Sequence, residues 1–435
     1  MYPRKIIAEL IDWKSSKNRK PLVLRGARQV GKTTAVTMFS EEFSQFISLN
    51  LEKTEDKKFF NENDSLSVII DKIFFEKDKL KHIDNTLIFI DEIQESSIAI
   101  SLLRYFYEDY PQYYVIAAGS LFEAVFDNAV NFPVGRVEYK FLYPLSFDEF
   151  LGALEENQSK EFYNTIPIPD FAHQKLFKLF NLYTLIGGMP EIVNVYRQTK
   201  DLVLLKKVYE SLLISYSEDV EKYARNATLT QVMRYAINKS FIYAGERIKF
   251  AGFGASNYGS REMGEALRTL EKARLLNLVY PTVQTKMPFY EDFKKSPRLH
   301  VLDTGLMNFY AGIQKEVFNS INLMDTYKGK VIEHIVGQEL IVNSSNLLSK
   351  ILFWVRDKKD SSAEVDYVYR FNNIGIPIEV KSGKIGKLKS LLIYMEMSDI
   401  DFAIRLYAGK LSVEKHRTSG GKSFTNDFPD RKSTR

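Results

Sequence analysis

The chain has 435 residues, enough for about two to four domains of ordinary size. It contains no cysteine, which excludes disulfides, thiolate zinc sites, iron–sulfur clusters and cysteine nucleophiles and fits a reducing compartment. Its 60 basic and 55 acidic residues give a formal net charge of +5, which is weak support for a polyanionic partner. Its function must therefore be sought in motifs.

The N-terminal segment predicts an amphipathic helix rather than a targeting signal. Glu9 and Asp12 interrupt the apolar stretch at residues 6–13, too early for the apolar core of a signal peptide. Elsewhere no run approaches the roughly 18 apolar residues of a membrane helix. We therefore expect a soluble, cytoplasmic protein without membrane association.

The next two predicted elements enclose the most specific motif of the chain. Residues 21–24 predict a short buried strand, and residues 34–39 can continue as a helix. Between them lies Gly26-Ala27-Arg28-Gln29-Val30-Gly31-Lys32-Thr33, which fits the P-loop template G-x-x-x-x-G-K-[ST] at each fixed position. A chance glycine turn is the alternative. The order strand, glycine loop, helix is the one that phosphate binding requires.

The P-loop template assigns a role to each of its residues. Backbone N–H groups of the loop and of the helix start would face the phosphates, from Gly26, Ala27, Arg28, Gln29, Val30, Gly31, Lys32, Thr33 and Thr34. The Lys32 ammonium would reach the β- and γ-phosphates, and the Thr33 hydroxyl would ligate Mg²⁺. The motif therefore predicts ATP and Mg²⁺ as cofactors.

Residues 20–150 alternate between predicted strands and helices, which is the pattern of a parallel α/β sheet. Further strands are predicted at 46–51, 86–90 and 113–118. The strand at 86–90 is apolar on both faces, as a central parallel strand should be. Beyond the sheet, Ser146 and Glu149 form a capping box that predicts the start of a helix.

An acidic pair follows the strand at 86–90. Asp91 and Glu92 at its carboxyl end match the Walker B arrangement. Asp91 would hold Mg²⁺ through water, and Glu92 would orient or deprotonate the attacking water. Because acids are common at strand ends, this assignment depends on the P-loop upstream in the same sheet.

Two further residues are candidates for the nucleotide site. Ser120 follows the strand at 113–118 and could sense the γ-phosphate, although a serine there could also serve for capping alone. Arg136 follows a glycine turn and could contact transition-state charge, within the chain or in a neighbouring subunit of a homo-oligomer. A surface arginine is the alternative for Arg136.

From about residue 160 to 315 the strand signals fade. Amphipathic helices are predicted at 206–223, 229–241 and 261–272, with an interruption by small residues at 251–255 and a short strand at 275–281. This order is the outline of a winged helix. A helical lid packed on an ATPase gives much the same pattern, so both interpretations stay open.

Strands return after about residue 325 and carry acidic residues with them. A helix is predicted at 330–340 and strands at 351–355, 364–369 and 376–380, the last two joined by a hairpin turn. The helix contains Glu333, and the first strand of the hairpin contains Asp366. Glu379 and Lys381 lie at the end of the second strand.

These four charged residues predict a second site. Glu379 and Lys381 are two apart on a strand and share a face, and Asp366 on the paired strand could meet them. Together with Glu333, they could hold Mg²⁺ through Asp366 and Glu379 and activate water against a phosphodiester, with Lys381 positioning the nucleophile. An edge hairpin with charges facing water is the alternative, which the apolar flanking segments disfavour.

The motifs of the whole chain resemble those of the bacterial and archaeal AAA-type ATPases that pair a P-loop core with a C-terminal domain of unknown function 4143. The markers follow one another in order through nearly the whole chain, at 25–34, 89–94, 118–120, 135–137, 144–147, 187–191, 302–306, 363–366 and 377–383.

The resemblance implies an ATPase core, a helical and winged-helix middle region, and a C-terminal domain similar to PD-(D/E)XK nucleases. It carries Glu333, Asp366, Glu379 and Lys381 onto the nuclease motif. The proline of that motif's name is Val365 here, a departure that many members of the nuclease superfamily tolerate.

We therefore expect an α/β protein of three domains. These are a P-loop AAA-type core at 1–160, a helical lid and winged-helix region at 161–318, and a nuclease-like domain with a basic tail at 319–435. The expected function is an Mg²⁺-dependent ATPase that acts on or is regulated by nucleic acid, with DNA as a candidate partner and its cleavage as a candidate activity. The alternative is a nucleotide-gated switch or an assembly scaffold whose C-terminal domain binds DNA or protein without cleaving.

Overall fold

The computed structural model describes residue 2 and residues 4–119, 135–313, 329–344, 350–358, 363–371, 374–381 and 388–426. The chain divides into two compact units. Unit 1 comprises residues 1–144, 218–230 and 269–275, and unit 2 comprises residues 145–217, 231–268 and 276–435. Among the described residues, no helix combines the length and apolar character needed to cross a bilayer.

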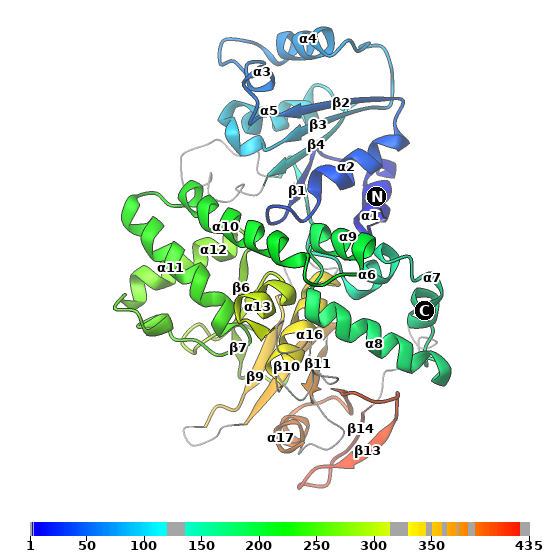
Figure 1. Cartoon of the computed structure of the whole chain (residues 1–435), viewed down its shortest axis with the longest axis vertical. Helices are drawn as coiled ribbons and strands as arrows, with labels where there is room; N and C mark the ends of the chain where they lie inside the picture. Colours follow the sequence, from blue (N-terminus) through cyan, green and yellow to red (C-terminus); the bar gives the residue numbers. More distant parts are fainter. Residues whose placement is uncertain are drawn as a thin grey trace. The chain divides into compact units, whose positions relative to one another are not determined.

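Unit 1 is built on a sheet of five parallel strands in the order β2-β3-β4-β1-β5 (Figure 1). The strands are β1 (Leu22–Arg25), β2 (Gln45–Asn50), β3 (Thr86–Asp91), β4 (Tyr114–Gly119) and β5 (Glu138–Phe141). The first four confirm the sequence prediction. Strand β5 gives no comparable signal, because it is short, half of its residues are charged, and it is only half-buried.

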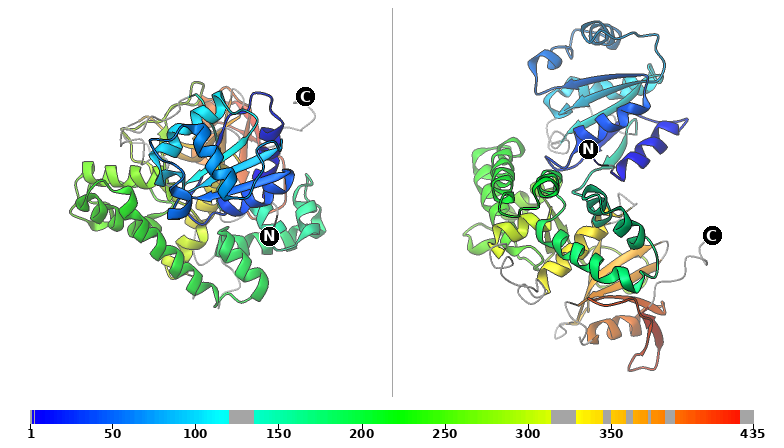
Figure 2. Two further views of the ribbon diagram at one scale, coloured as in Figure 1. Left: turned by 90° about the horizontal axis from the view of Figure 1, so that it is seen from above. Right: turned by 45° about the vertical axis from the view of Figure 1, so that its right-hand side comes forward.

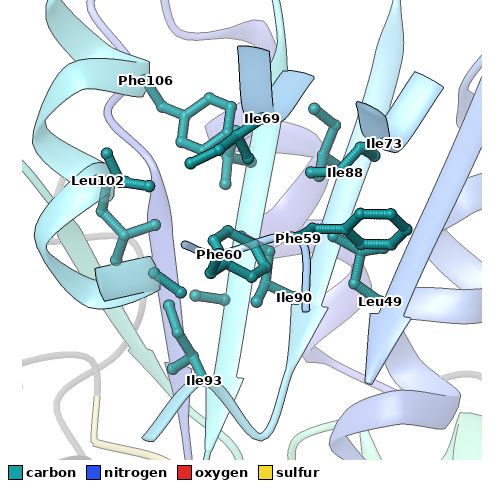
Figure 3. Close-up of a cluster of buried hydrophobic side chains, with 14 of the residues drawn as sticks. Leu49, Phe59, Phe60, Ile69, Ile73, Ile88, Ile90, Ile93, Leu102 and Phe106 are labelled. Atoms are coloured by element: carbon teal, nitrogen blue, oxygen red, sulfur yellow. The ribbon is translucent and has the colours of Figure 1, made fainter. Parts of the chain in front are cut away.

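Helices cover both faces of this sheet (Figure 2). They are α1 (Ile6–Ser15), α2 (Lys32–Phe39), α3 (Thr54–Lys57), α4 (Leu66–Glu76) and α5 (Ser97–Glu108), with short 3₁₀ turns η1 (Ser40–Glu42) and η2 (Ile93–Glu95). On one face, Ile69 and Ile73 of α4 and Phe106 of α5 join Ile88 and Ile90 of β3 in a single buried cluster (Figure 3). This core fixes β3, and with it the acidic pair at its carboxyl end.

Most of the helices lie in unit 2. They are α6 (Phe147–Ala153), α7 (Asn157–Tyr163), α8 (Asp170–Ile186), α9 (Pro190–Thr199), α10 (Leu205–Tyr223), α11 (Ala227–Tyr243), η4 (Phe253–Ala255), α12 (Ser260–Lys272), α13 (Thr304–Tyr310), α16 (Lys330–Val342) and α17 (Lys389–Met397). The predicted capping box at the start of α6 is confirmed, because Ser146 and Glu149 each accept the other's backbone N–H. The C-terminal ends of α10 and α12 belong to unit 1.

A mixed seven-stranded sheet forms the C-terminal part of unit 2, in the order β13-β14-β12-β11-β10-β9-β7. Its strands are β7 (Pro281–Thr282), β9 (Leu352–Val355), β10 (Glu364–Phe371), β11 (Ile374–Val380), β12 (Phe402–Leu406), β13 (Glu414–Arg417) and β14 (Ser423–Asn426). The antiparallel hairpin β10–β11 lies inside this sheet, as the apolar flanks predict. A separate antiparallel pair joins β6 (Leu276–Val279) to β8 (Arg298–Val301).

The two faces of this sheet belong to different hydrophobic clusters. Trp354 and Val365 pack with Leu391 of α17, whereas Phe353 and Tyr367 pack with α16 residues. The alternation along the strands is what a sheet covered on both faces requires. The polar segment 414–426 forms β13 and β14 without an apolar strand pattern, because Phe424 is the one buried side chain among residues 414–417 and 423–425.

Candidate nucleotide site and C-terminal carboxylate cluster

The P-loop lies at the carboxyl edge of the parallel sheet of unit 1, between β1 and α2. Gly31 caps α2 with a φ of 94°, a left-handed conformation that glycine adopts without strain. At Gly26 a Cβ atom would lie only 2.2 Å from the Leu142 carbonyl oxygen, so a side chain has no room there. Both fixed glycines of the motif are therefore required by the backbone path.

The Lys32 side chain is buried and turns back over the loop. Its Nζ donates hydrogen bonds to the Gly26 carbonyl at 3.0 Å and to the Ala27 carbonyl at 2.9 Å. Burial lowers the pKa of Lys32, and the nearby Glu92 and Asp91 oppose that shift. The ammonium is therefore held where a P-loop lysine meets phosphate oxygens.

A hydrogen bond joins the two halves of the predicted nucleotide site. The Thr33 hydroxyl donates to Asp91 Oδ2 at 2.7 Å. The sheet register explains the meeting: Arg25 of β1 lies beside Gly119 of β4, and Ile90 of β3 lies beside Ala117 of the same strand. A hydroxyl next to a buried carboxylate is a donor set that suits Mg²⁺, whose preferred ligands are hard oxygens.

Glu92 follows Asp91 in a left-handed conformation, with a φ of 51°. Residues other than glycine rarely adopt this backbone conformation. It directs the Glu92 side chain differently from the Asp91 side chain. Gln94 Nε2 donates to Glu92 Oε2 at 2.5 Å. Burial raises the pKa of Glu92, and the Gln94 hydrogen bond and Lys32 counteract it. A carboxylate with a raised pKa is suited to receive a proton from water.

Gln94 is a site residue to which the motif assigned no role. A Cβ at position 119 would lie 2.2 Å from Gln94 Oε1, so glycine at the end of β4 makes room for this amide. The same Oε1 atom is buried and has no hydrogen-bond partner among the described residues. Gln94 therefore connects the end of β4 with Glu92. Its position in the marker segment 89–94 was the only sequence signal.

Arg28 of the P-loop forms an ion pair with a residue far along the chain. Its Nη1 lies 2.5 Å from Oδ1 of Asp219, which is on α10 and belongs to unit 1. Burial acts to lower the pKa of Arg28, but Asp219 outweighs it and the pKa is raised. Lys222, one turn further on α10, pairs with both Asp219 and Glu52. No sequence motif predicts this role of Asp219.

Arg136 lies away from the nucleotide site of its own chain. Its Nε pairs with Glu108 Oε1 at 2.8 Å, at the end of α5. The chain runs from Glu108 into β4 at Tyr114, and Glu138 of β5 lies beside Leu22 of β1, so these residues mark the amino ends of the strands. The P-loop is at the opposite, carboxyl edge. The other candidate, Ser120, is outside the described residues.

The four C-terminal candidates are brought together by β10, β11 and α16. Lys381 Nζ lies 2.5 Å from Glu379 Oε1, and Asp366 Oδ2 accepts the Val380 backbone N–H at 2.8 Å. Glu333 approaches them from α16. The second carboxylate oxygen of Glu379 is buried without a hydrogen-bond partner among the described residues. The predicted constellation of residues therefore exists.

An arginine that sequence reasoning missed lies within this cluster. Arg298 of β8 is buried, and its guanidinium pairs with Glu364 and donates to the Asp366 carbonyl oxygen at 3.0 Å. It also lies 3.8 Å from carboxylate oxygens of both Glu333 and Asp366. The Arg298 guanidinium is therefore a second cation among these carboxylates, besides the Lys381 ammonium. No motif marks Arg298, which precedes the cluster by more than thirty residues.

The carboxylates of the cluster hold protons more tightly than usual. Burial, together with the charge of Asp366, raises the pKa of both Glu333 and Glu379 to about 7. Burial also raises the pKa of Asp366, although the Val380 N–H and Arg298 oppose it. In the described part of the chain, no three His, Cys, Asp or Glu side chains are arranged to hold a metal ion.

Three family models match successive parts of the chain. They are an AAA domain at residues 18–151, a domain of unknown function 8612 at residues 177–317 and a domain of unknown function 4143 at residues 328–420. The chain belongs to the AAA-type P-loop ATPases that carry this C-terminal domain. Its membership confirms the resemblance stated from the motifs.

Three solved structures illustrate the similarity of this chain to known proteins. A Walker-type ATPase of Pyrococcus abyssi is 14% identical, with a TM-score of 0.47, over 72% of this chain and 96% of that chain. A signal transduction ATPase with numerous domains and a tetratricopeptide repeat sensor, from Pyrococcus horikoshii, is 14% identical with a TM-score of 0.28, over 79% and 48%. The Aeropyrum pernix ORC1 protein in complex with DNA is 10% identical with a TM-score of 0.28, over 72% and 91%. No curated protein sequence matches the chain.

Proposed function

We propose that this AAA-type ATPase hydrolyses ATP with Mg²⁺ at the site formed by Lys32, Thr33, Asp91 and Glu92. Lys32 binds the β- and γ-phosphates, and Thr33 and Asp91 hold the metal ion, which neutralises charge on the phosphates. Glu92 orients the attacking water and accepts its proton. The backbone of residues 26–34 binds the phosphates.

The observation that carries this proposal is the hydrogen bond between Thr33 and Asp91 at 2.7 Å. It joins the P-loop to the acidic strand end, so two motifs that are distant in sequence form one site. The raised pKa of the adjacent Glu92 supports its role as a base, since that role requires a carboxylate able to accept a proton near neutral pH.

The test is ATP turnover by the Glu92→Gln variant. We expect a loss of about 100-fold or more in kcat, because general-base catalysis contributes roughly 10²–10⁴-fold, while ATP binding is retained. Glu95→Gln is the matched control, since Glu95 follows in the same turn and pairs only loosely with Lys57 at 3.5 Å. Equal turnover in both variants would contradict the role of Glu92.

We further propose that turnover acts on, or is regulated by, nucleic acid through the regions at 161–318 and 319–435. Antiparallel pairing of β6 with β8 directly after α12 supports a winged-helix arrangement in the first region. The central β10–β11 hairpin with Asp366, Glu379 and Lys381 supports a nuclease-like domain in the second. The direct test is ATP turnover with and without single- and double-stranded DNA, in which unchanged rates would contradict regulation by DNA.

One observation favours the alternative in which the C-terminal domain binds without cleaving. Arg298 already supplies a cation to the carboxylates that a nuclease would use to hold Mg²⁺. We therefore expect no Mg²⁺-dependent nicking of plasmid DNA by the intact protein. Nicking that is lost in the Asp366→Ala, Lys381→Ala double variant would overturn this expectation and assign cleavage to the cluster.

A further inference from the structure

A cavity of about 610 Å³ lies within unit 2, between α8, α16 and the ends of strands of the C-terminal sheet. This volume is in the range of small-molecule sites. Its wall is largely aromatic, formed by Phe147, Tyr163, Phe177, Phe180, Tyr369 and Tyr407. The AAA-type nucleotide site is in unit 1, so this cavity belongs to a different site.

The rings on one side of the cavity are held in place by one another. Phe147 meets Tyr163 edge-on with 5.2 Å between ring centroids, and it meets Phe180 edge-on at the same separation. Phe147 also begins helix α6, whose capping box fixes its backbone. The wall is therefore a preformed set of flat apolar faces and edges, which suits a planar aromatic ligand better than a flexible chain.

Several polar groups line the same cavity. One is the Glu339 carboxylate, which accepts hydrogen bonds from the Phe147 N–H and the Tyr183 hydroxyl, and three others could contact a ligand. Within the described part of the chain, neither the Tyr163 hydroxyl nor the Asn181 amide has a hydrogen-bond partner. Burial and two nearby carboxylates raise the pKa of Tyr163, so this hydroxyl remains a donor at neutral pH. The third group is the Lys381 ammonium, whose side chain is 27% exposed.

Lys381 places the cavity beside the carboxylate cluster. Its ammonium pairs with Glu379, while Arg298 offsets the neighbouring charges of Glu333, Glu364 and Asp366. The four carboxylates of the cluster face three cations, Lys381, Arg298 and Arg247, so an anion that approaches Lys381 meets a partly compensated cluster. The cavity thus offers aromatic walls, an amide and a hydroxyl for hydrogen bonding, a cation at its boundary and one carboxylate, Glu339, that is hydrogen-bonded within the protein.

We propose that this cavity binds a nucleobase, with the adjoining phosphate placed at Lys381. Bases stack on aromatic side chains, and their edges bond to amides and hydroxyls as the single-strand readers of nucleic acid do. The inference rests on the proposed binding of nucleic acid by the C-terminal region. Two sources offer this chemistry, an unpaired base of a single strand and a free nucleotide.

The test measures binding by the full-length protein with ADP and Mg²⁺ in excess, so that the P-loop is occupied. The probes are a decamer of thymidylate, an abasic decamer of equal charge and free thymidine monophosphate. The variant is Asn181→Trp, which fills the cavity and removes no hydrogen bond of the described residues. Gln174→Trp is the matched control, an exposed residue of the same helix that does not line the cavity.

We expect the protein to bind the thymidylate decamer about tenfold or more tightly than the abasic decamer, since each stacked base adds affinity of that order. Asn181→Trp abolishes this preference and Gln174→Trp retains it. Val336→Phe, which fills the cavity from α16, is expected to behave as Asn181→Trp does and guards against misfolding of either variant.

The other outcomes test the proposed base site and the proposed binding of nucleic acid separately. Equal affinity for both decamers, unchanged by Asn181→Trp, overturns the base site and leaves nucleic-acid binding intact. Binding of thymidine monophosphate alone, lost in Asn181→Trp, supports the base site and counts against nucleic acid as its source. If no probe binds, the base site is overturned, while the ATPase proposal is judged by the Glu92 experiment.

Discussion

At the scale of single residues, the sequence motifs predict some members of the two candidate sites and miss others. Lys32, Thr33 and Asp91 are found from spacing alone, because a P-loop and an acidic strand end in one parallel sheet must meet at its carboxyl edge. Asp219 and Arg298 are not found, since each reaches its site from a distant element and belongs to no short motif. A buried charged residue of this kind is recognised only from its partners.

The ion pair between Arg28 and Asp219 predicts an effect on ATP affinity. Asp219 is buried and negative, and it engages the one arginine of the P-loop. Asp219→Asn removes this negative charge beside the P-loop, so we expect the Kd of MgATP to fall about threefold or more, the scale of a partly screened charge. Equilibrium titration of a fluorescent ATP analogue measures it.

The control for this prediction is Glu218→Gln, an exposed neighbour on the same helix. It removes an equal charge from α10 without touching the pair. A weaker affinity in Asp219→Asn than in Glu218→Gln would contradict the prediction, because it would mean that the ion pair shapes the loop for ATP rather than competing with it.

At the scale of single elements, two of the marker segments have a structural role rather than a catalytic one. The segments 187–191 and 302–306 meet at Asp303, whose carboxylate accepts backbone N–H groups from Gly188 at 2.7 Å and from Gly305 at 2.9 Å. Asp303 thereby caps α13 and ties it to the end of α8. In this structure these marker residues have a structural role, which the sequence alone could not distinguish from a catalytic role.

The close packing at this junction predicts a large cost for a single methyl group. Gly187 has a φ of 71°, and a Cβ there would lie 1.9 Å from Asp303 Oδ1. Gly187→Ala should therefore combine backbone strain of about 1–3 kcal/mol, since its ψ of −169° lies in a region essentially restricted to glycine, with an overpacking cost of about 1–3 kcal/mol. Urea denaturation measures the loss in the free energy of unfolding.

Gly312→Ala separates these two contributions. Gly312 has the same φ of 71°, and no atom of the described residues lies within 4 Å of its Cβ position, so this variant reports the strain of a positive φ without overpacking. We expect Gly187→Ala to be the more destabilised of the two by at least about 1 kcal/mol. Equal losses would show that the Asp303 junction adapts to the methyl group without cost.

At the scale of the whole molecule, the sequence predicted the parallel AAA sheet and the central β10–β11 hairpin, because periodicity and apolar runs are local signals. It could not predict that β7 pairs with β9, or that parts of α10 and α12 belong to unit 1. These are long-range pairings of short segments. These segments are stabilised by strands and helices that lie far from them in the sequence, so a local sequence pattern cannot predict the pairing.

The division into two units predicts how the protein responds to nucleotide. Unit 1 contains the P-loop and its own buried cluster around β3, whereas the clusters at Trp354 and Phe353 belong to unit 2. Nucleotide that binds only folded unit 1 stabilises it by about 2.7 kcal/mol at a free concentration of about 100 times its Kd. We therefore expect scanning calorimetry to show two transitions, of which ADP with Mg²⁺ raises one.

Gly187→Ala identifies the other transition, because residue 187 lies in unit 2 and its substitution should lower the Tm of that unit alone. Nucleotide and substitution would then act on separate peaks of the same trace. A single transition that moves with both would mean that the two units unfold together. Binding at the P-loop would then be energetically linked to the carboxylate cluster and the aromatic cavity, which is the coupling that a nucleotide-gated switch needs.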